Sequence, residues 1–266
     1  MHSKPRGTRR RVPRERRLAV DIAIVARRVP SFPLLRRMQL DSIEAWRTEL
    51  KNSRIRIGWP AILAHCYGQV CREIPELRDV YVARPWPYLY RHPDPIACIT
   101  MHRPESPEKP HLGRLVWGRY LCAANSTPLD VQKQMDLWSK QSIDQVYPDA
   151  LQLERWPAPF RRLQWYLLMR WAGRKRAKNL GTFSISSLGH MGALNGYHPL
   201  VTTSSLAIGP IEPNKPTDVV LLCDHRVIDG VLAAAALASL EEKLMKIPHV
   251  ILDPQATSLD TELRDK

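Results

Sequence analysis

The stretch Leu222-Cys223-Asp224-His225-Arg226-Val227-Ile228-Asp229-Gly230 is the one from which the fold and the chemistry of this chain are inferred. Residues 218–222 lead into it as an apolar, β-branched run that predicts a buried strand. Residues 231–245 follow it and are rich in alanine, which predicts a helix. His225 therefore lies on a short turn between a strand and a helix. A neutral histidine takes a proton from a thiol, amine or hydroxyl near neutral pH, so His225 is a candidate general base.

Asp229 and Gly230 close this turn. We expect the carboxylate of Asp229 to anchor the loop through a buried pair, and Gly230 to permit a backbone shape or close approach that a side chain would block. The alternative is that His225 has only a structural role, as a lone histidine in a loop usually does. The pattern His-x-x-x-Asp-Gly also arises by composition alone in on the order of a few per cent of chains this long. The strand before the turn and the helix after it favour the functional interpretation.

A second stretch, Gly181-Thr182-Phe183-Ser184-Ile185-Ser186-Ser187-Leu188-Gly189, lies upstream of the histidine. Its pattern predicts a strand with Ser184 and Ser186 on one face, followed by a glycine turn. Attack on a thioester creates a tetrahedral oxyanion, and a fixed hydroxyl is one donor that stabilises such a charge. Ser186 is the candidate donor, and a purely structural strand is the alternative.

Together these stretches resemble a known family. Asp-His-Arg-x-x-Asp-Gly at 224–230 resembles the active-site motif of the acyltransferase component of 2-oxoacid dehydrogenase complexes and, more distantly, of chloramphenicol acetyltransferase. Residues 181–189 are similar to that family's Gly-Thr-Phe-Thr-Ile-Ser-Ser-Leu-Gly segment. The resemblance implies that His225 deprotonates an acceptor for attack on a thioester, and that Ser186 donates to the oxyanion. It also implies that Asp229 binds an arginine near the N-terminus, for which the candidates are Arg16, Arg17, Arg27 and Arg28.

The resemblance also implies an architecture and a substrate. We expect an α/β fold (an α+β two-layer sandwich) with a large mixed β-sheet, as in the chloramphenicol acetyltransferase-like, CoA-dependent acyltransferases. The expected assembly is a homotrimer or a higher trimer-based particle, with Ser186 facing His225 across a subunit boundary. Coenzyme A or an acyl carrier protein would supply the acyl group, Arg226 and Ser187 are the candidate coenzyme A-binding residues, and no metal is expected.

Members of the family carry lipoyl domains and a subunit-binding domain ahead of the catalytic domain. Here the catalytic-like region is expected at 18–252, and no lipoyl-lysine segment is visible. We therefore expect a stand-alone member of this fold with a different acceptor.

The charge of the chain is strongly basic and unevenly placed. Lys and Arg number 40 against 26 Asp and Glu, which gives a net charge of +14. Residues 1–17 are basic and contain almost nothing apolar, so we expect an arm that is disordered when free, and a polar tail at 253–266. Such an arm can contact nucleic acid, a membrane surface or an acidic protein, but a solvated tail is the simpler interpretation.

Cysteine usage and hydropathy bear on the cellular location expected for the protein. The five cysteines include no Cys-x-x-Cys pair, which predicts buried, reduced thiols in a cytoplasmic protein. The longest apolar runs are far shorter than a membrane span.

Other segments carry local signals. Helices are expected at 18–29, at 42–51 with a capping box from Asp41 and Glu44, and from Trp59 to before Pro75. Strands are expected at 55–57, 96–101 and 115–121, and Thr127-Pro128 predicts the start of a further helix.

Residues 154–180 depart most from the family pattern, with a helix rich in Trp, Leu and Arg followed by a basic cluster. The segment is interpreted as a half-buried helix with a solvated basic end. An amphipathic or acyl-chain-binding element, or a phosphate-binding cluster for coenzyme A or a carrier protein, are the functional alternatives.

Three hypotheses for the function follow. The first is a CoA-dependent acyltransferase, which the presence of His225, Asp229 and Ser186 favours. The second is a non-catalytic scaffold or assembly subunit built on the same trimeric fold. The third is nucleic-acid binding through residues 1–17, which no recognisable DNA- or RNA-binding module supports, so no specific nucleic-acid partner is expected.

Overall fold

The computed structural model of the chain describes residues 7–9, 11–104, 106, 108 and 113–252. The predicted polar tail, 253–266, lies outside the described residues, as do residues 1–6 and 10 of the predicted basic arm.

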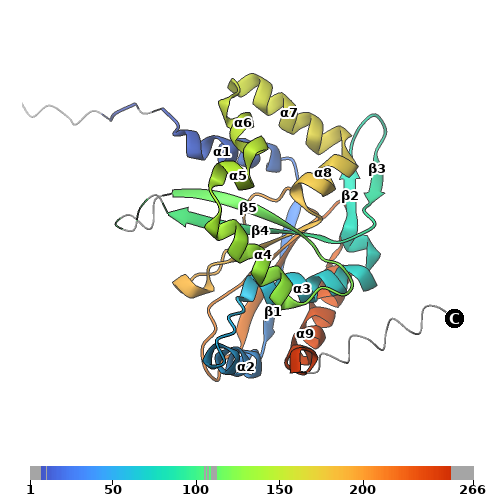
Figure 1. Ribbon diagram of the computed structural model, residues 1–266. Helices are drawn as coiled ribbons and strands as arrows, with labels where there is room; N and C mark the ends of the chain where they lie inside the picture. Colours follow the sequence, from blue (N-terminus) through green and yellow to red (C-terminus); the bar gives the residue numbers. More distant parts are fainter. Residues whose placement is uncertain (1–6, 10, 105, 107, 109–112, 253–266) are drawn as a thin grey trace, which may run out of the picture.

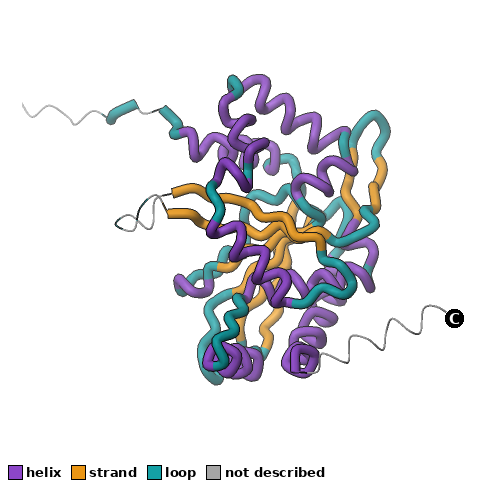
Figure 2. The backbone as a smooth tube through the Cα atoms, viewed as in Figure 1, coloured by secondary structure: helices purple, strands orange, loops and turns teal. Residues whose placement is uncertain are grey.

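The chain forms both helices and strands, in runs of consecutive strands and runs of consecutive helices (Figures 1 and 2). In chain order the described elements are α1 (Arg17–Ala26), β1 (Ser31–Met38), α2 (Asp41–Asn52), α3 (Trp59–Glu73), β2 (Asp79–Val82), β3 (Tyr88–Arg91), β4 (Ile96–Pro104), β5 (Gly113–Leu121), α4 (Pro128–Lys140), α5 (Ile143–Val146), α6 (Pro148–Arg155), α7 (Ala158–Trp171), α8 (Gly173–Leu180), β6 (Phe183–Ser187), β7 (Ser204–Ile208), β8 (Thr217–Asp224) and α9 (Gly230–Leu252).

The described residues form one large mixed sheet in the order β1-β8-β7-β6-β4-β5. Strands β4, β6 and β7 run parallel to their neighbours in that set, whereas β1, β8 and β5 pair antiparallel. The β2–β3 hairpin makes a separate two-stranded sheet. The predicted α/β fold with a large mixed sheet is therefore confirmed.

One face of the large sheet carries the main core. Ile185, Leu206 and Leu221 lie opposite one another on β6, β7 and β8, and all three are buried. They belong to one hydrophobic cluster with residues of α2, α3 and α9. Because side chains alternate along a strand, Ser184 and Ser186 lie on the opposite face.

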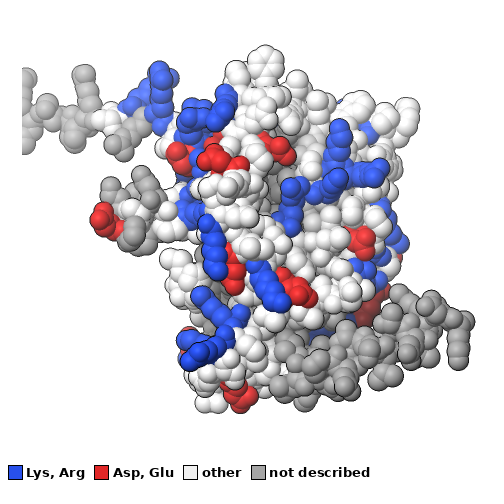
Figure 3. Space-filling view, in the orientation of Figure 1, with Lys and Arg blue, Asp and Glu red and all other residues white. Residues whose placement is uncertain are grey.

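Helices α1, α6 and α7 lie on the other side of the sheet from α2, α3 and α9 (Figure 1). Helix α7 contacts α1, α8 and β2. Its residues Arg161 and Trp165 are buried, while four large apolar side chains along it stay exposed: Phe160, Leu163, Leu167 and Trp171. The interpretation of a half-buried helix is thus confirmed. The basic end of this segment is solvated only in part, because Arg176 on α8 is 1% exposed and its Nε donates to the carbonyl oxygen of Val201 at 3.0 Å. The upper edge of the face in Figure 3, over α7, is largely uncharged.

Two local predictions were wrong. Residues 55–57 form no strand. Asp41 does not cap α2, because Leu40 occupies the N-cap without a side-chain hydrogen bond, and Asp41 instead accepts a hydrogen bond from the backbone N–H of Asn214 at 3.2 Å. The Thr127 cap is confirmed: its hydroxyl accepts from the backbone N–H of Asp130, whose carboxylate accepts from the N–H of Thr127.

The five cysteines are buried free thiols, as predicted. Burial raises the pKa of the Cys98 thiol to about 12, so this group stays protonated near neutral pH. Among the helices that the structure describes, none is long and apolar enough to cross a membrane.

Candidate active site

His225 lies on the turn between β8 and α9, as the sequence predicts, and its side chain is exposed. Its backbone N–H donates to the carbonyl oxygen of Pro30 at 2.8 Å, directly before β1. The imidazole packs against the ring of Phe32 with 4.6 Å between ring centroids. The backbone of two strands and one aromatic ring therefore hold the histidine in place at the end of the sheet.

The hydrogen bond of the imidazole selects its tautomer. Nδ1 of His225 lies 3.2 Å from the carbonyl oxygen of Ile228. A carbonyl oxygen only accepts hydrogen bonds, so Nδ1 carries the proton in the neutral ring and Nε2 carries the lone pair. This arrangement leaves Nε2 as a base on an exposed turn.

A buried ion pair stabilises the turn around His225. Asp224 is fully buried, and its carboxylate accepts hydrogen bonds from Nε of Arg226 at 2.8 Å and from Nη2 at 2.5 Å. The backbone N–H groups of Val227 and Ile228 both donate to the carbonyl oxygen of Asp224 at 3.0 Å. Bidentate pairs of this type fix geometry as well as charge. Asp224 and Arg226 directly precede and follow His225 in the sequence, so their ion pair fixes the backbone on both sides of the histidine.

Asp229 has a different place from the one predicted. It is exposed, and its Oδ1 accepts from the backbone N–H of Leu232 at 2.8 Å at the start of α9. Among the described hydrogen bonds and ion pairs, none joins Asp229 to any arginine. The buried pair expected of Asp229 is instead made by Asp224 and Arg226, because Asp224 lies inside the ladder and Asp229 outside it.

The N-terminal candidates for a partner of Asp229 have other contacts. Nη1 of Arg17 donates to the carbonyl oxygen of Glu154 at 3.2 Å. The guanidinium of Arg28 lies over the ring of Tyr166. Neither Arg16 nor Arg27 makes a described side-chain hydrogen bond. Within the described residues of a single chain, Asp229 therefore does not make the predicted ion pair with an N-terminal arginine.

Gly230 also departs from expectation. It begins α9, and a Cβ built on it would meet no atom within 4 Å in the chain. Neither a special backbone shape nor a close approach within the chain explains a glycine at this position.

Ser186 lies on β6, as predicted, and lines a cavity of about 230 Å³ on the sheet face opposite the main core. Thr100, Ser184 and Asn195 also line this cavity. Ser187 pairs with Ile208 and, by strand alternation, faces the other side of the sheet. The two predicted serines are thus adjacent in sequence but lie on opposite faces.

His225 does not line the cavity of Ser186. In the strand register Ser186 pairs with Ala207 of β7, and Ala207 pairs with Val220 of β8. His225 lies five residues beyond Val220, so the two backbones are separated by roughly 16 Å along the strand and roughly 10 Å across the sheet, or about 19 Å in all. Within one chain the two side chains therefore do not form one site.

The cavity holds a histidine that the sequence analysis missed. His198 lines it, and Nε2 of His198 lies 2.8 Å from the hydroxyl oxygen of Ser205. Burial lowers the pKa of His198 below its usual value. The residue lies in a loop, Tyr197-His198-Pro199, without a motif or characteristic spacing, so only the fold brings it beside Ser186.

No protein-family model matches this sequence, and no curated protein sequence is similar to it. The structure, in contrast, resembles solved ones. The dihydrolipoamide acetyltransferase of Azotobacter vinelandii matches with a TM-score of 0.65 at 17% identity, over 94% of this chain and 100% of that one. A probable dihydrolipoamide acetyltransferase from Listeria monocytogenes matches with a TM-score of 0.64 at 14% identity, over 91% of this chain and 95% of that one.

The cubic core of the pyruvate dehydrogenase multienzyme complex matches with a TM-score of 0.57 at 18% identity, over 94% of this chain and 100% of that one. At these identities the matches show the fold. This chain has the α/β fold of the catalytic cores of the 2-oxoacid dehydrogenase acyltransferases, as its two motifs predict.

Proposed function

We propose that this protein is an acyltransferase that moves an acyl group from a thioester of coenzyme A, or of a carrier protein, to a small nucleophilic acceptor. The observation that carries the proposal is the state of His225. The turn exposes its imidazole, and the Ile228 carbonyl keeps the proton on Nδ1, so that Nε2 is free to act as a base.

The chemistry follows from that nitrogen. Nε2 of His225 takes the proton of the acceptor, for example of a thiol, whose sulfur then attacks the thioester carbonyl carbon. The carbonyl oxygen becomes an oxyanion, which accepts a hydrogen bond from the hydroxyl of Ser186. When the tetrahedral intermediate collapses, the C–S bond to the donor breaks, and the leaving thiolate takes the proton back from the imidazolium of His225.

A comparison at the residue level supports these roles. The catalytic mechanism of the Azotobacter vinelandii enzyme has been investigated through a serine, a histidine and an asparagine four positions after that histidine. In this chain the fourth residue after His225 is Asp229. An aspartate therefore stands at the position where that enzyme has an asparagine, directly before α9.

The separation of Ser186 and His225 supports an active site between subunits. Because about 19 Å separates their backbones within one chain, a common site requires Ser186 of one copy and His225 of another. The neighbour from the pyruvate dehydrogenase complex forms a cubic core. We accordingly propose a homotrimer, or a larger particle built from trimers, with Arg226 and Ser187 as candidate contacts for coenzyme A.

The test is release of free thiol from a panel of acyl-coenzyme A thioesters, with and without dihydrolipoamide as the acceptor. The His225→Ala protein is compared with His102→Ala, which removes another exposed histidine, on β4. The proposal predicts release that His225→Ala abolishes and His102→Ala leaves unchanged. Equal release by the two variants would refute the role of His225, and no release from any thioester by wild-type protein would favour a non-catalytic scaffold.

A further inference from the structure

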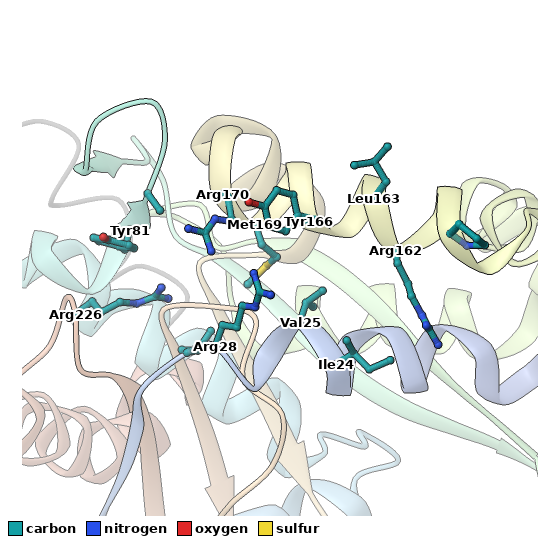
Figure 4. Close-up of a pocket in the computed structure, with 13 residues that line it drawn as sticks. Ile24, Val25, Arg28, Tyr81, Arg162, Leu163, Tyr166, Met169, Arg170 and Arg226 are labelled. Atoms are coloured by element: carbon teal, nitrogen blue, oxygen red, sulfur yellow. The ribbon is translucent and has the colours of Figure 1, made fainter.

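A groove that shares only Arg226 with the residues of the proposed acyl transfer lies between α1 and α7 (Figure 4). Its volume is about 490 Å³, within the range of roughly 300–1,000 Å³ that is usual for small-molecule sites. Tyr81 and Ala83 of the β2 region and Arg226 of the His225 turn close one end. The groove therefore begins beside the reactive turn and extends along the segment that departs most from the family pattern.

The lining of this α1–α7 groove is apolar and cationic. Seven apolar residues line it: Ile24, Val25, Val29, Ala83, Pro159, Leu163 and Met169. Four arginines line it as well, Arg28, Arg162, Arg170 and Arg226, together with two tyrosines and no Asp or Glu. A surface of this composition complements a ligand that has both an apolar part and negative charge.

Two of the four arginines have a carboxylate partner. Arg226 is paired with Asp224 at 2.5 Å. Arg162 lies 3.5 Å from Asp21, a carboxylate that Arg161 also binds. The charge of Arg226 is therefore matched by one carboxylate, whereas Asp21 carries one negative charge against both Arg161 and Arg162 and leaves one positive charge beside the groove.

The other two, Arg28 and Arg170, make no ion pair among the described residues. Their guanidiniums lie 5.8 and 5.2 Å from the ring centroid of Tyr166, so both cations contact the same ring. Nε of Arg170 is buried and has no hydrogen-bond partner in the described part of the chain. This Nε is closed to solvent, but no described carboxylate pairs with the Arg170 guanidinium, so its charge remains available to an anionic group in the groove.

We propose that the α1–α7 groove binds an amphipathic anion, an aliphatic chain with a phosphate or carboxylate head, with the head between Arg28 and Arg170 and the chain along the apolar lining. The occupant is a single dissolved molecule rather than a bilayer, because the lining is a groove of limited volume and not a flat face. The proposal uses neither His225 nor Ser186, and of the residues proposed for acyl transfer only Arg226 lines the groove.

The experiment is isothermal titration of the full-length protein with dodecyl phosphate below its micelle concentration. Inorganic phosphate supplies the head alone, and dodecyl maltoside supplies the chain without the charge. The proposal predicts saturable one-site binding of dodecyl phosphate, and binding at least tenfold weaker for each of the other two compounds. Equal binding of dodecyl maltoside would overturn the role of charge.

Variants locate the site. Arg28→Gln with Arg170→Gln should weaken binding of dodecyl phosphate at least tenfold, whereas the matched loss of two charges in Arg174→Gln with Lys175→Gln on α8 should leave it within twofold. Ile24 is 40% exposed, so it tolerates substitution, and Ile24→Asp should weaken binding while Ile24→Lys should not. Equal weakening by both double variants would show attraction by net charge only and would overturn the proposal.

Two further measurements test whether the groove acts independently of His225 and whether its occupant is a dissolved molecule. The His225→Ala protein should bind dodecyl phosphate as the wild type does, so the groove and the acyl-transfer proposal succeed or fail separately. Vesicles of phosphatidic acid and phosphatidylcholine should not compete with dodecyl phosphate. Competition by vesicles that is lost in Ile24→Asp would assign the groove to a membrane surface and would overturn binding of a dissolved amphiphile.

Discussion

Replacing Arg226 by alanine tests whether the buried pair with Asp224 holds the His225 turn. The side chain of Asp224 is 1% exposed and that of Arg226 is 25% exposed, with Nη2 of Arg226 at 2.5 Å from Oδ2 of Asp224. Removing one partner of a buried pair costs about 3–5 kcal/mol, since the other charge stays buried. The backbone N–H of Arg226 still donates to Asp224 at 3.1 Å, so we expect a loss of about 2–4 kcal/mol in the free energy of unfolding.

The same strand offers a matched control. Arg37 of β1 and Asp218 of β8 also form an Arg–Asp pair, at 3.3 Å, but their side chains are 72% and 41% exposed. Exposed pairs contribute at most about 1 kcal/mol. Arg37→Ala should therefore cost far less than Arg226→Ala, although each variant removes one arginine from an Arg–Asp pair.

The assay is urea unfolding of both variants, followed by tryptophan fluorescence. Arg226→Ala should lower the midpoint by roughly 1 M, since small proteins have slopes of about 1–3 kcal/mol per molar urea. The double variant Asp224→Asn with Arg226→Gln should lose less than Arg226→Ala, because no buried charge is left unpaired. Equal, small losses for Arg226→Ala and Arg37→Ala would refute the reasoning.

Three further predictions follow from the structure. Burial lowers the pKa of His65 to about 4 from the usual 6.5. At pH 5 the unfolded chain binds a proton at His65 that the folded chain does not, so this residue should make the protein about 2 kcal/mol less stable at pH 5 than at pH 7 in urea unfolding. His65→Gln should reduce the pH dependence by about that amount, while the buried His198, whose pKa is also lowered, leaves a remainder of the same sign. A Cβ on Gly118 would lie 2.2 Å from the Trp138 ring, so Gly118→Ala should cost about 1–3 kcal/mol by thermal unfolding, and Trp138→Leu should restore most of it. Ser186→Ala should slow thiol release roughly a hundredfold or more at an unchanged urea midpoint; an unchanged rate would remove Ser186 from the mechanism.

What the sequence predicts well is local or periodic. The strand 218–222, the helix after Gly230 and the cap at Thr127 depend on residues close in sequence, and each is found. The cap expected of Asp41 failed because its carboxylate binds the backbone of Asn214, 173 residues away. Local propensity carries no information about such a contact.

The same limit applies to the candidate site. The motif predicts His225 and Ser186 as candidates, but it does not show which acid stabilises the turn, because the burial that distinguishes Asp224 from Asp229 depends on the neighbouring strand β1. His198 and the α1–α7 groove arise where distant segments meet. Asp21 and Arg161, for example, are 140 residues apart and join α1 to α7.

The most direct test of the central claim, that Ser186 and His225 form one active site across a subunit boundary, is complementation between two inactive variants. His225→Ala and Ser186→Ala chains with different tags are co-expressed, and particles that carry both tags are purified. In a closed ring of three that contains both variants, one boundary of the three joins an intact His225 to an intact Ser186, so about one third of the wild-type rate should return. Activity no higher than that of the parent variants would contradict the account.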